Sequence, residues 1–126
     1  MKKIIATDCA PPAVGPYSQA ISAGDLVFCS GQIGIDPLTG RIAAGAREQT
    51  TQCIMNLRAV LEATGLSLMD VVKTTVFLTD INDFAEVNAA YAVLFTGEPP
   101  ARSAVAVTSL PKGARVEIEA IALRCS

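Results

Sequence analysis

The segment 116–123 restricts the fold most, because it alternates like a strand yet carries apolar residues on both faces. Val116, Ile118, Ala120 and Ala122 point one way, and Glu117, Glu119, Ile121 and Leu123 point the other way. A strand with no simply polar face belongs in a sheet that is covered on both sides. We therefore expect helices against one face and a partner subunit against the other.

The other segments alternate between strand and helix patterns. Apolar residues recur at three- and four-residue steps over 45–64, which predicts an amphipathic helix that ends at Gly65. A second helix is expected to begin at a capping box over Asp83–Glu86 and to end at Gly97. Strands are predicted at 26–30, 71–78, 102–108 and 116–123. This order predicts an α+β (α/β two-layer) fold, with a mixed sheet and two main helices on one face.

Composition narrows the classes of protein. The 126 residues suffice for one domain, 1–126, and hydrophobic residues make up 51% against 17% charged, which excludes disorder. So few charges also favour an oligomer, in which subunit interfaces cover apolar surface. The formal net charge of −2 makes nucleic acid an improbable partner. The absence of histidine removes His-dependent catalytic triads and histidine metal ligands.

Neither a signal peptide nor a membrane span is predicted, and we expect a cytoplasmic protein whose four cysteines stay reduced. Nucleotide-binding glycine loops and metal-loop spacings are missing. The Ser109–Lys112 stretch matches a Ser-x-x-Lys string, but Pro111 makes a connecting turn the better interpretation. Cys29 lies in a predicted buried strand, and nothing near it in sequence would activate its thiol.

Several stretches occur together in a characteristic order. They are Gly15–Ala20 (GPYSQA), Ser30–Ile33 (SGQI), Val72–Leu78 (VKTTVFL), Asn82–Tyr91, Pro100–Ser103 (PARS) and Val116–Ala120 (VEIEA). With this combination the whole chain resembles the Rid family (YjgF type, also called the L-PSP endoribonuclease family).

This resemblance implies a chorismate-mutase-like fold, assembled as a homotrimer with clefts between subunits. It implies a hydrolase that converts reactive enamines and imines, such as 2-iminobutanoate and 2-iminopropanoate, into 2-oxo acids and ammonia. These intermediates escape from pyridoxal-phosphate enzymes, to which the function is thereby linked. The resemblance implies no cofactor and no metal for the Rid protein itself.

Mapped onto this chain, the resemblance assigns catalytic roles to Arg102, Glu117 and Tyr17. Arg102 matches the arginine that binds the substrate carboxylate, Glu117 the glutamate that orients water, and Tyr17 the pocket tyrosine. Four further positions are assigned to substrate binding: Ser30, Gly31, Asn88 and Ala104.

The chemistry of these residue types agrees with that assignment. A guanidinium group is planar and fits a carboxylate with two hydrogen bonds. Hydrolysis of a C=N bond then requires a group that orients or deprotonates water and a proton for the nitrogen. No strong nucleophile is needed, because an imine is already electrophilic. Without the resemblance, a structural salt bridge remains an alternative role for Arg102 or Glu117.

The distance between these two residues poses a problem. If 102–108 and 116–123 formed a simple hairpin, Arg102 would lie roughly 13 Å along the strand from Glu117. Either these strands do not form such a hairpin, or one cleft combines groups from two subunits.

The chain also departs from the family pattern. Ala104 stands where a cysteine is frequent, and the segment 95–100 before Arg102 is shortened. Both changes affect the rim of the cleft and hence the range of substrates. Three other functions remain open at this point: an endoribonuclease or translation inhibitor, a non-catalytic trimer that binds 2-oxo acids, and a chaperone-like protein.

Overall fold

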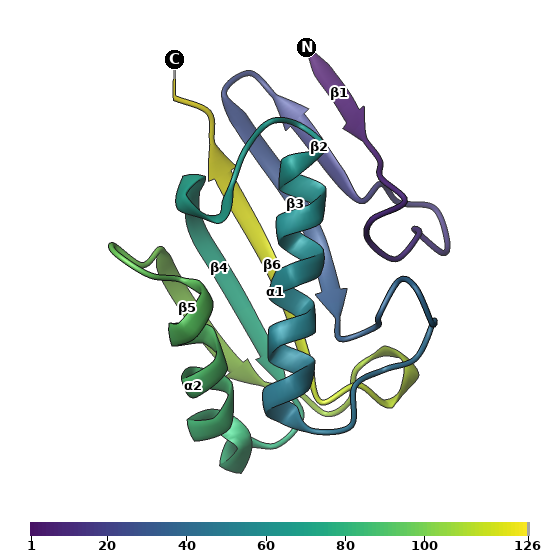
Figure 1. The fold of residues 1–126 in the computed structure, drawn as a ribbon, viewed down its shortest axis with the longest axis vertical. Helices are drawn as coiled ribbons and strands as arrows, with labels where there is room; N and C mark the ends of the chain where they lie inside the picture. The colour runs from purple at the N-terminus through teal and green to yellow at the C-terminus, as the bar shows by residue number, and fades with distance from the viewer. Residues whose placement is uncertain (126) are drawn as a thin grey trace.

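The computed structural model describes residues 1–125, which form one six-stranded mixed sheet with two α-helices on one of its faces (Figure 1). Three short 3-10 helices, η1 (Leu68–Asp70), η2 (Ile81–Asp83) and η3 (Pro111–Gly113), lie in the connections. The main elements are β1 (Lys2–Ile5), β2 (Ala20–Ala23), β3 (Leu26–Ile33), α1 (Ala46–Glu62), β4 (Val71–Leu78), α2 (Phe84–Leu94), β5 (Ala101–Ala106) and β6 (Val116–Leu123). The predicted α+β fold is confirmed.

The strand order is β1-β2-β3-β6-β4-β5, so β4 lies between the last two strands of the chain. β5 runs parallel to β4, with Arg102 level with Thr74, whereas the other pairs are antiparallel. A parallel pair requires a crossover connection, which α2 supplies here. A simple hairpin of the last two strands is therefore wrong, and β5 is an edge strand.

Helix α1 covers the centre of the sheet, where it packs on β3 and β6. Its side chains Cys53, Ile54 and Leu57 are completely buried, as the three- and four-residue spacing predicts. On β6, Val116 and Ile118 are also completely buried beneath the helices. Burial of these apolar side chains is the main force that holds the helix layer on the sheet.

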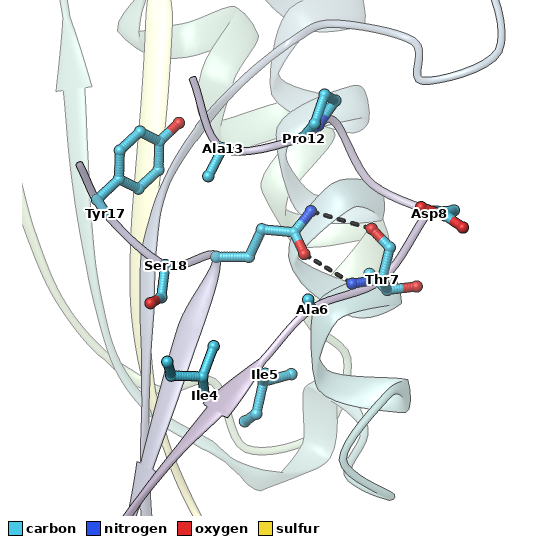
Figure 2. Close-up of a pocket in the computed structure, with 10 residues that line it drawn as sticks. Ile4, Ile5, Ala6, Thr7, Asp8, Pro12, Ala13, Tyr17 and Ser18 are labelled. Atoms are coloured by element: carbon cyan, nitrogen blue, oxygen red, sulfur yellow. Dashed lines mark hydrogen bonds between the residues drawn. The ribbon is translucent and has the colours of Figure 1, made fainter. Parts of the chain in front are cut away.

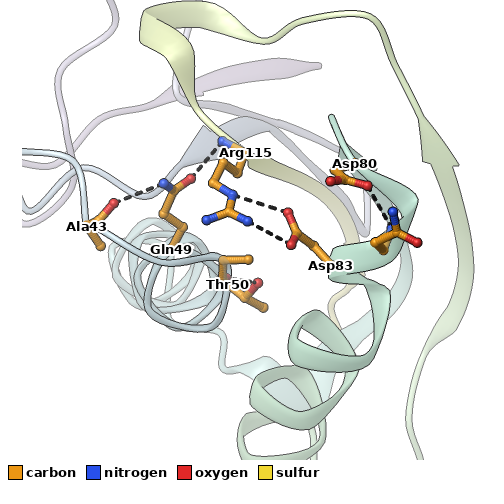
Figure 3. Close-up of polar contacts among 8 residues, drawn as sticks. Ala43, Gln49, Thr50, Asp80, Asp83 and Arg115 are labelled. Carbon is orange, nitrogen blue, oxygen red and sulfur yellow. Dashed lines mark hydrogen bonds and ion pairs between the residues drawn. The ribbon is translucent and has the colours of Figure 1, made fainter.

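The expected capping box at the start of α2 is wrong. Asp83 precedes the helix, but its side chain makes no capping hydrogen bond. Its carboxylate instead accepts hydrogen bonds from Arg115, at 2.7 Å from Nη2 and 3.2 Å from Nε (Figure 3). Glu86, the other expected member of the box, pairs with Arg47 at 2.7 Å. Ion pairs with residues distant in sequence therefore replace the capping box.

The sheet face opposite the helices is uncovered in the single chain. It carries Leu26, Phe28, Val105 and Leu123, whose side chains are 37–43% exposed. Register places Leu26, Phe28 and Leu123 together, because Leu26 pairs with Leu123 and Phe28 pairs with Ile121, whereas Val105 lies on β5 level with Phe77. A contiguous apolar face of this kind marks a surface that another molecule covers. The expected partner subunit on this face stays a prediction.

Among residues 1–125, no helix combines the length and the hydrophobicity that crossing a membrane requires.

Candidate functional site

A cleft of about 770 Å³ opens on the uncovered side of the sheet. Its lining includes four of the predicted site residues, Tyr17, Ser30, Gly31 and Glu117, which come from a loop and from two neighbouring strands. Segments far apart in sequence therefore meet here.

An irregularity in β3 shapes the floor of this cleft. Cys29 pairs with Ala120 and Gln32 with Ile118, so β3 has one residue more than β6 between these two pairs. Ser30 and Gly31 occupy this bulge and drop out of the ladder. Bulges of this kind re-aim side chains and are frequent next to active sites.

Ser30 joins the bulge to the loop that precedes β2. Its hydroxyl donates a hydrogen bond to the carbonyl oxygen of Ser18 at 2.6 Å. Its backbone N–H donates to the carbonyl oxygen of Gln19 at 3.0 Å. The hydroxyl proton of Ser30 is therefore already used in a hydrogen bond, and its oxygen can act toward a ligand only as an acceptor.

Gly31 leaves the space that the Glu117 side chain occupies. A Cβ atom at position 31 would overlap the Glu117 carboxylate. Only glycine lets this carboxylate lie against the bulge in β3. The requirement is steric, since the backbone of Gly31 is not left-handed.

The Glu117 carboxyl is half-buried, and burial raises its pKa above the usual range. The charge of Glu119, two residues along the same face of β6, raises this pKa further. A carboxylate with a raised pKa is a better proton acceptor near neutral pH than an ordinary glutamate. Glu117 therefore has the properties of a general base.

Tyr17 stands at the rim of the cleft. Its ring is 51% exposed, and its hydroxyl accepts a hydrogen bond of 3.4 Å from the backbone N–H of Val14. Figure 2 shows Tyr17 and Pro12 beside a second, smaller cavity, which lies between this loop and β1. Both residues line the larger cleft as well, so the loop forms a wall between the two cavities.

Arg102 lies elsewhere, on the edge strand β5 and on the helix side of the sheet. Its Nη1 donates a hydrogen bond to Asn88 Oδ1 on α2 at 2.8 Å. The guanidinium carbon lies 4.9 Å from the ring centre of Tyr91 and 5.4 Å from that of Phe84. Stacking and the asparagine fix the guanidinium plane. Arg102 is exposed, so its remaining N–H groups are accessible to an anion.

The surroundings of Arg102 form a cavity of about 410 Å³, which Pro99 and Pro100 of the shortened segment help to line. Ala104 lies on the same face of β5, two residues further on, and packs against the core. It offers no side-chain donor or thiol. Asn88 therefore positions Arg102, while Ala104 shapes the strand beside it.

One chain does not bring all the predicted residues together. Arg102 and Asn88 lie on the helix side of the outermost strand, whereas Glu117 faces the opposite side of β6. β4 separates the two strands, which places their backbones roughly 10 Å apart. The predicted site residues thus fall into two separate groups, which we call the basic and the acidic half-site of the predicted site.

The sequence analysis missed three features of these half-sites. Glu119 and Lys112 line the larger cleft, and Lys112 has a left-handed backbone with φ of 57°. Tyr91 and Phe84 form the aromatic support of Arg102. The two-residue spacing of Glu117 and Glu119 is a sequence signal for a shared face. The aromatic support has no such signal, because it depends on how α2 crosses β5.

Alternative chemistries find no support in the described chain. Cys29 is buried, and its burial raises the thiol pKa to about 12, so it is a poor nucleophile. Residues 1–125 contain no cluster of three His, Cys, Asp or Glu side chains that could hold a metal.

The fold and these residues define a family. The model of the family described as Endoribonuclease L-PSP matches residues 7–124. The chain therefore belongs to the Rid (YjgF, L-PSP endoribonuclease) family, and its α+β fold is the chorismate-mutase-like fold of that family.

Individual relatives are similar over their whole length. The 2-iminobutanoate/2-iminopropanoate deaminase of Salmonella typhimurium is 51% identical, covering 98% of this chain and 99% of the relative. The mouse protein of the same name is 47% identical, covering 98% and 93%. The crystal structure of Escherichia coli TdcF with bound serine has a TM-score of 0.95 at 47% identity, covering 98% and 99%.

Proposed function

We propose that this protein is a 2-iminobutanoate/2-iminopropanoate deaminase whose site combines Arg102 with Glu117. It adds water to the C=N bond of small 2-imino acids and releases a 2-oxo acid and ammonia. The relatives of that name are 47–51% identical across nearly the whole chain. The observation that carries the site assignment is the exposed guanidinium of Arg102, which Asn88 and two aromatic rings hold in place.

Arg102 binds the substrate carboxylate through its remaining N–H groups. Two parallel N–H···O bonds fix both the position and the orientation of a planar carboxylate. Because the guanidinium is already immobilised, little freedom is lost when the substrate binds. The C=N carbon, one bond away from the carboxylate, is thereby presented to water in a fixed geometry.

Glu117 takes a proton from the attacking water. The water oxygen bonds to the C=N carbon, the π electrons of that bond move to nitrogen, and Glu117 passes the proton it took from water to that nitrogen, which gives the amino alcohol. Glu117 then takes the hydroxyl proton of the amino alcohol as the C=O bond forms and the C–N bond breaks. It gives this proton to the leaving nitrogen, which departs as ammonia, so the cycle balances without another acid. Tyr17 and the oxygen of Ser30 orient the nitrogen and the water.

The two half-sites come together between copies of the chain in a homotrimer. The edge strand β5 carries Arg102 to the border of one subunit, and the Glu117 cleft opens on the uncovered face of the next. The exposed apolar side chains around Phe28 favour this association. Each cleft then contains the Arg102 guanidinium of one subunit and the Glu117 carboxylate of another, although no single subunit has a complete site.

The upstream partner of this chemistry is an enzyme that releases 2-imino acids. Pyridoxal-phosphate enzymes that eliminate water from hydroxyamino acids produce such compounds. The proposed role is to remove these electrophiles before they react with other amines.

The assay for this function is release of 2-oxobutanoate from 2-iminobutanoate that a threonine dehydratase generates in the cuvette. We expect wild type to accelerate release, and Arg102→Ala to reduce kcat/KM by about a hundredfold or more, since the substrate loses its anchor. Arg58→Ala is the matched control, because Arg58 is an exposed arginine on α1 that pairs with Glu62. No acceleration by wild type contradicts the function. Equal activity of wild type and Arg102→Ala contradicts the site.

A further inference from the structure

Gln19 is a nearly buried polar side chain at the end of the loop that lines the Glu117 cleft. Its side chain is 5% exposed. Its Oε1 accepts a hydrogen bond from the backbone N–H of Thr7 at 2.7 Å. Its Nε2 donates to the carbonyl oxygens of Thr7 at 3.1 Å and Pro11 at 2.8 Å. The two bonds to Thr7 are drawn in Figure 2. One carboxamide therefore ties both ends of the segment 7–11 to the start of β2.

The other anchors of the loop are Ala10, which is buried in the core, and the two hydrogen bonds from Ser30 to the carbonyls of Ser18 and Gln19. Between β1 and β2, the backbone hydrogen bond formed within the loop joins Tyr17 N–H to the carbonyl of Gly15 at 2.9 Å. Three prolines, Pro11, Pro12 and Pro16, remove further backbone donors. The Gln19 carboxamide therefore replaces the backbone hydrogen bonds that a regular segment would have.

Space on both sides of the loop makes its position sensitive to this anchor. Pro12 and Tyr17 face the large cleft on one side and the cavity of about 370 Å³ on the other. A segment with open volume behind it is not held by packing alone. If the anchor is lost, the loop can move into the smaller cavity, and the cleft becomes wider.

We infer that Gln19 is a positioning residue that sets the width of the substrate cleft and so favours 2-imino acids with short side chains. It acts through Pro12 and Tyr17 and does not touch the substrate. This inference rests on the proposed deaminase function for its kinetic test, but the anchor itself can be tested without turnover.

The informative variant is Gln19→Glu, which keeps the shape of the side chain. An ionised carboxylate still accepts from Thr7 N–H, but it has no donor for the carbonyls of Thr7 and Pro11. Burial near two carbonyl oxygens disfavours its charged form, so the variant regains one donor as the pH falls. The other ionisable side chains that line the smaller cavity are Asp8 and Tyr17, and both are unchanged in the variant.

Gln49→Glu is the matched control. Gln49 is 3% exposed, donates to the carbonyl of Ala43 at 2.9 Å and accepts from Arg115 N–H at 2.8 Å (Figure 3). It is a backbone anchor of the same chemistry, but it lines neither cavity. Both variants should therefore lose stability because each buries a glutamate. Only Gln19→Glu should also change the width of the cleft.

The experiment compares kcat/KM for 2-iminopropanoate and for the 2-imino acid with a leucine side chain. We expect Gln19→Glu to lose about ten- to a hundredfold on the short imine, mainly through KM, and clearly less on the long one. This ratio between substrates is independent of the folded fraction. The loss relative to wild type should also shrink as the pH is lowered. Gln49→Glu should keep the wild-type ratio between the two substrates at every pH.

Hydrogen exchange provides the second readout, which needs no substrate. Amides of residues 7–17 should exchange faster in Gln19→Glu than in wild type and in Gln49→Glu. An unchanged substrate ratio, or unchanged exchange in this segment, overturns the inference. Wild type that hydrolyses no imine refutes the proposed function instead, and the exchange data then decide whether Gln19 anchors the loop.

Discussion

Gly31 and Glu117 show how one missing side chain can shape a reactive carboxylate. The Glu117 carboxylate occupies the volume in which a Cβ atom of residue 31 would lie. Burial raises its pKa, and Glu119 adds repulsion from the same face. Sequence reasoning, aided by the family resemblance, chose Glu117 and Gly31, but it could not predict their mutual contact. That contact depends on the bulge between Cys29 and Gln32, which no local pattern signals.

Gly31→Ala should abolish most deaminase activity in a protein that still folds. The added methyl group forces the Glu117 carboxylate away from its position, whereas the backbone of residue 31 tolerates alanine. We expect at least a tenfold loss in kcat. Gly45→Ala is the control, because its Cβ also meets a carboxylate, that of Glu48, which is exposed and free to turn away. Equal activity of the two variants would refute the steric argument.

Glu119→Gln should extend activity to lower pH. Glu119 raises the Glu117 pKa through charge repulsion, so removing its charge lowers that pKa. Glu117 acts in its deprotonated form, and the rate falls as the pH drops through its pKa. The acid limb of the kcat/KM profile should therefore shift to lower pH. A limb that stays in place, or moves to higher pH, contradicts the role of Glu117 as the base.

Local patterns predicted several secondary structure elements, but not the strands β1 and β2. The strands 71–78 and 116–123 have the predicted bounds, and α1 begins and ends within two residues of its prediction. The partner of β5 was not predictable, since strand order depends on a crossover and not on adjacent residues. The capping box predicted at the start of α2 was wrong for a related reason. Arg115, 32 residues away in sequence, takes the Asp83 carboxylate that the local motif would use.

The Asp83–Arg115 pair should stabilise the fold more than the Arg47–Glu86 pair, although both contacts measure 2.7 Å. The Asp83 side chain is only 13% exposed and accepts two hydrogen bonds, whereas both members of the other pair are more than half exposed. Double-mutant cycles in urea should give a coupling energy of about 1 kcal/mol for the first pair and a clearly smaller one for the second. The reverse order would show that burial does not decide these energies.

At the scale of the whole molecule, one chain does not bring the two groups of predicted site residues together. Arg102 of the basic half-site is exposed on the edge strand, and the acidic half-site opens on the uncovered side of the sheet. The family resemblance predicted the members of both half-sites, but only the strand order explains why they are apart. Whether the predicted single domain 1–126 assembles as a trimer is the remaining structural prediction, and it determines whether the two charges meet.

Complementation between two inactive variants tests this account most directly. Arg102→Ala keeps the acidic half-site, and Glu117→Gln keeps the basic one. The two variants would be coexpressed with different tags, purified as mixed oligomers and assayed for 2-oxobutanoate release. If each cleft takes Arg102 from one subunit and Glu117 from the next, every mixed trimer restores one of its three clefts, so about a third of the clefts become active, although each variant alone is inactive. Mixed oligomers that stay as inactive as the single variants would contradict a site shared between subunits.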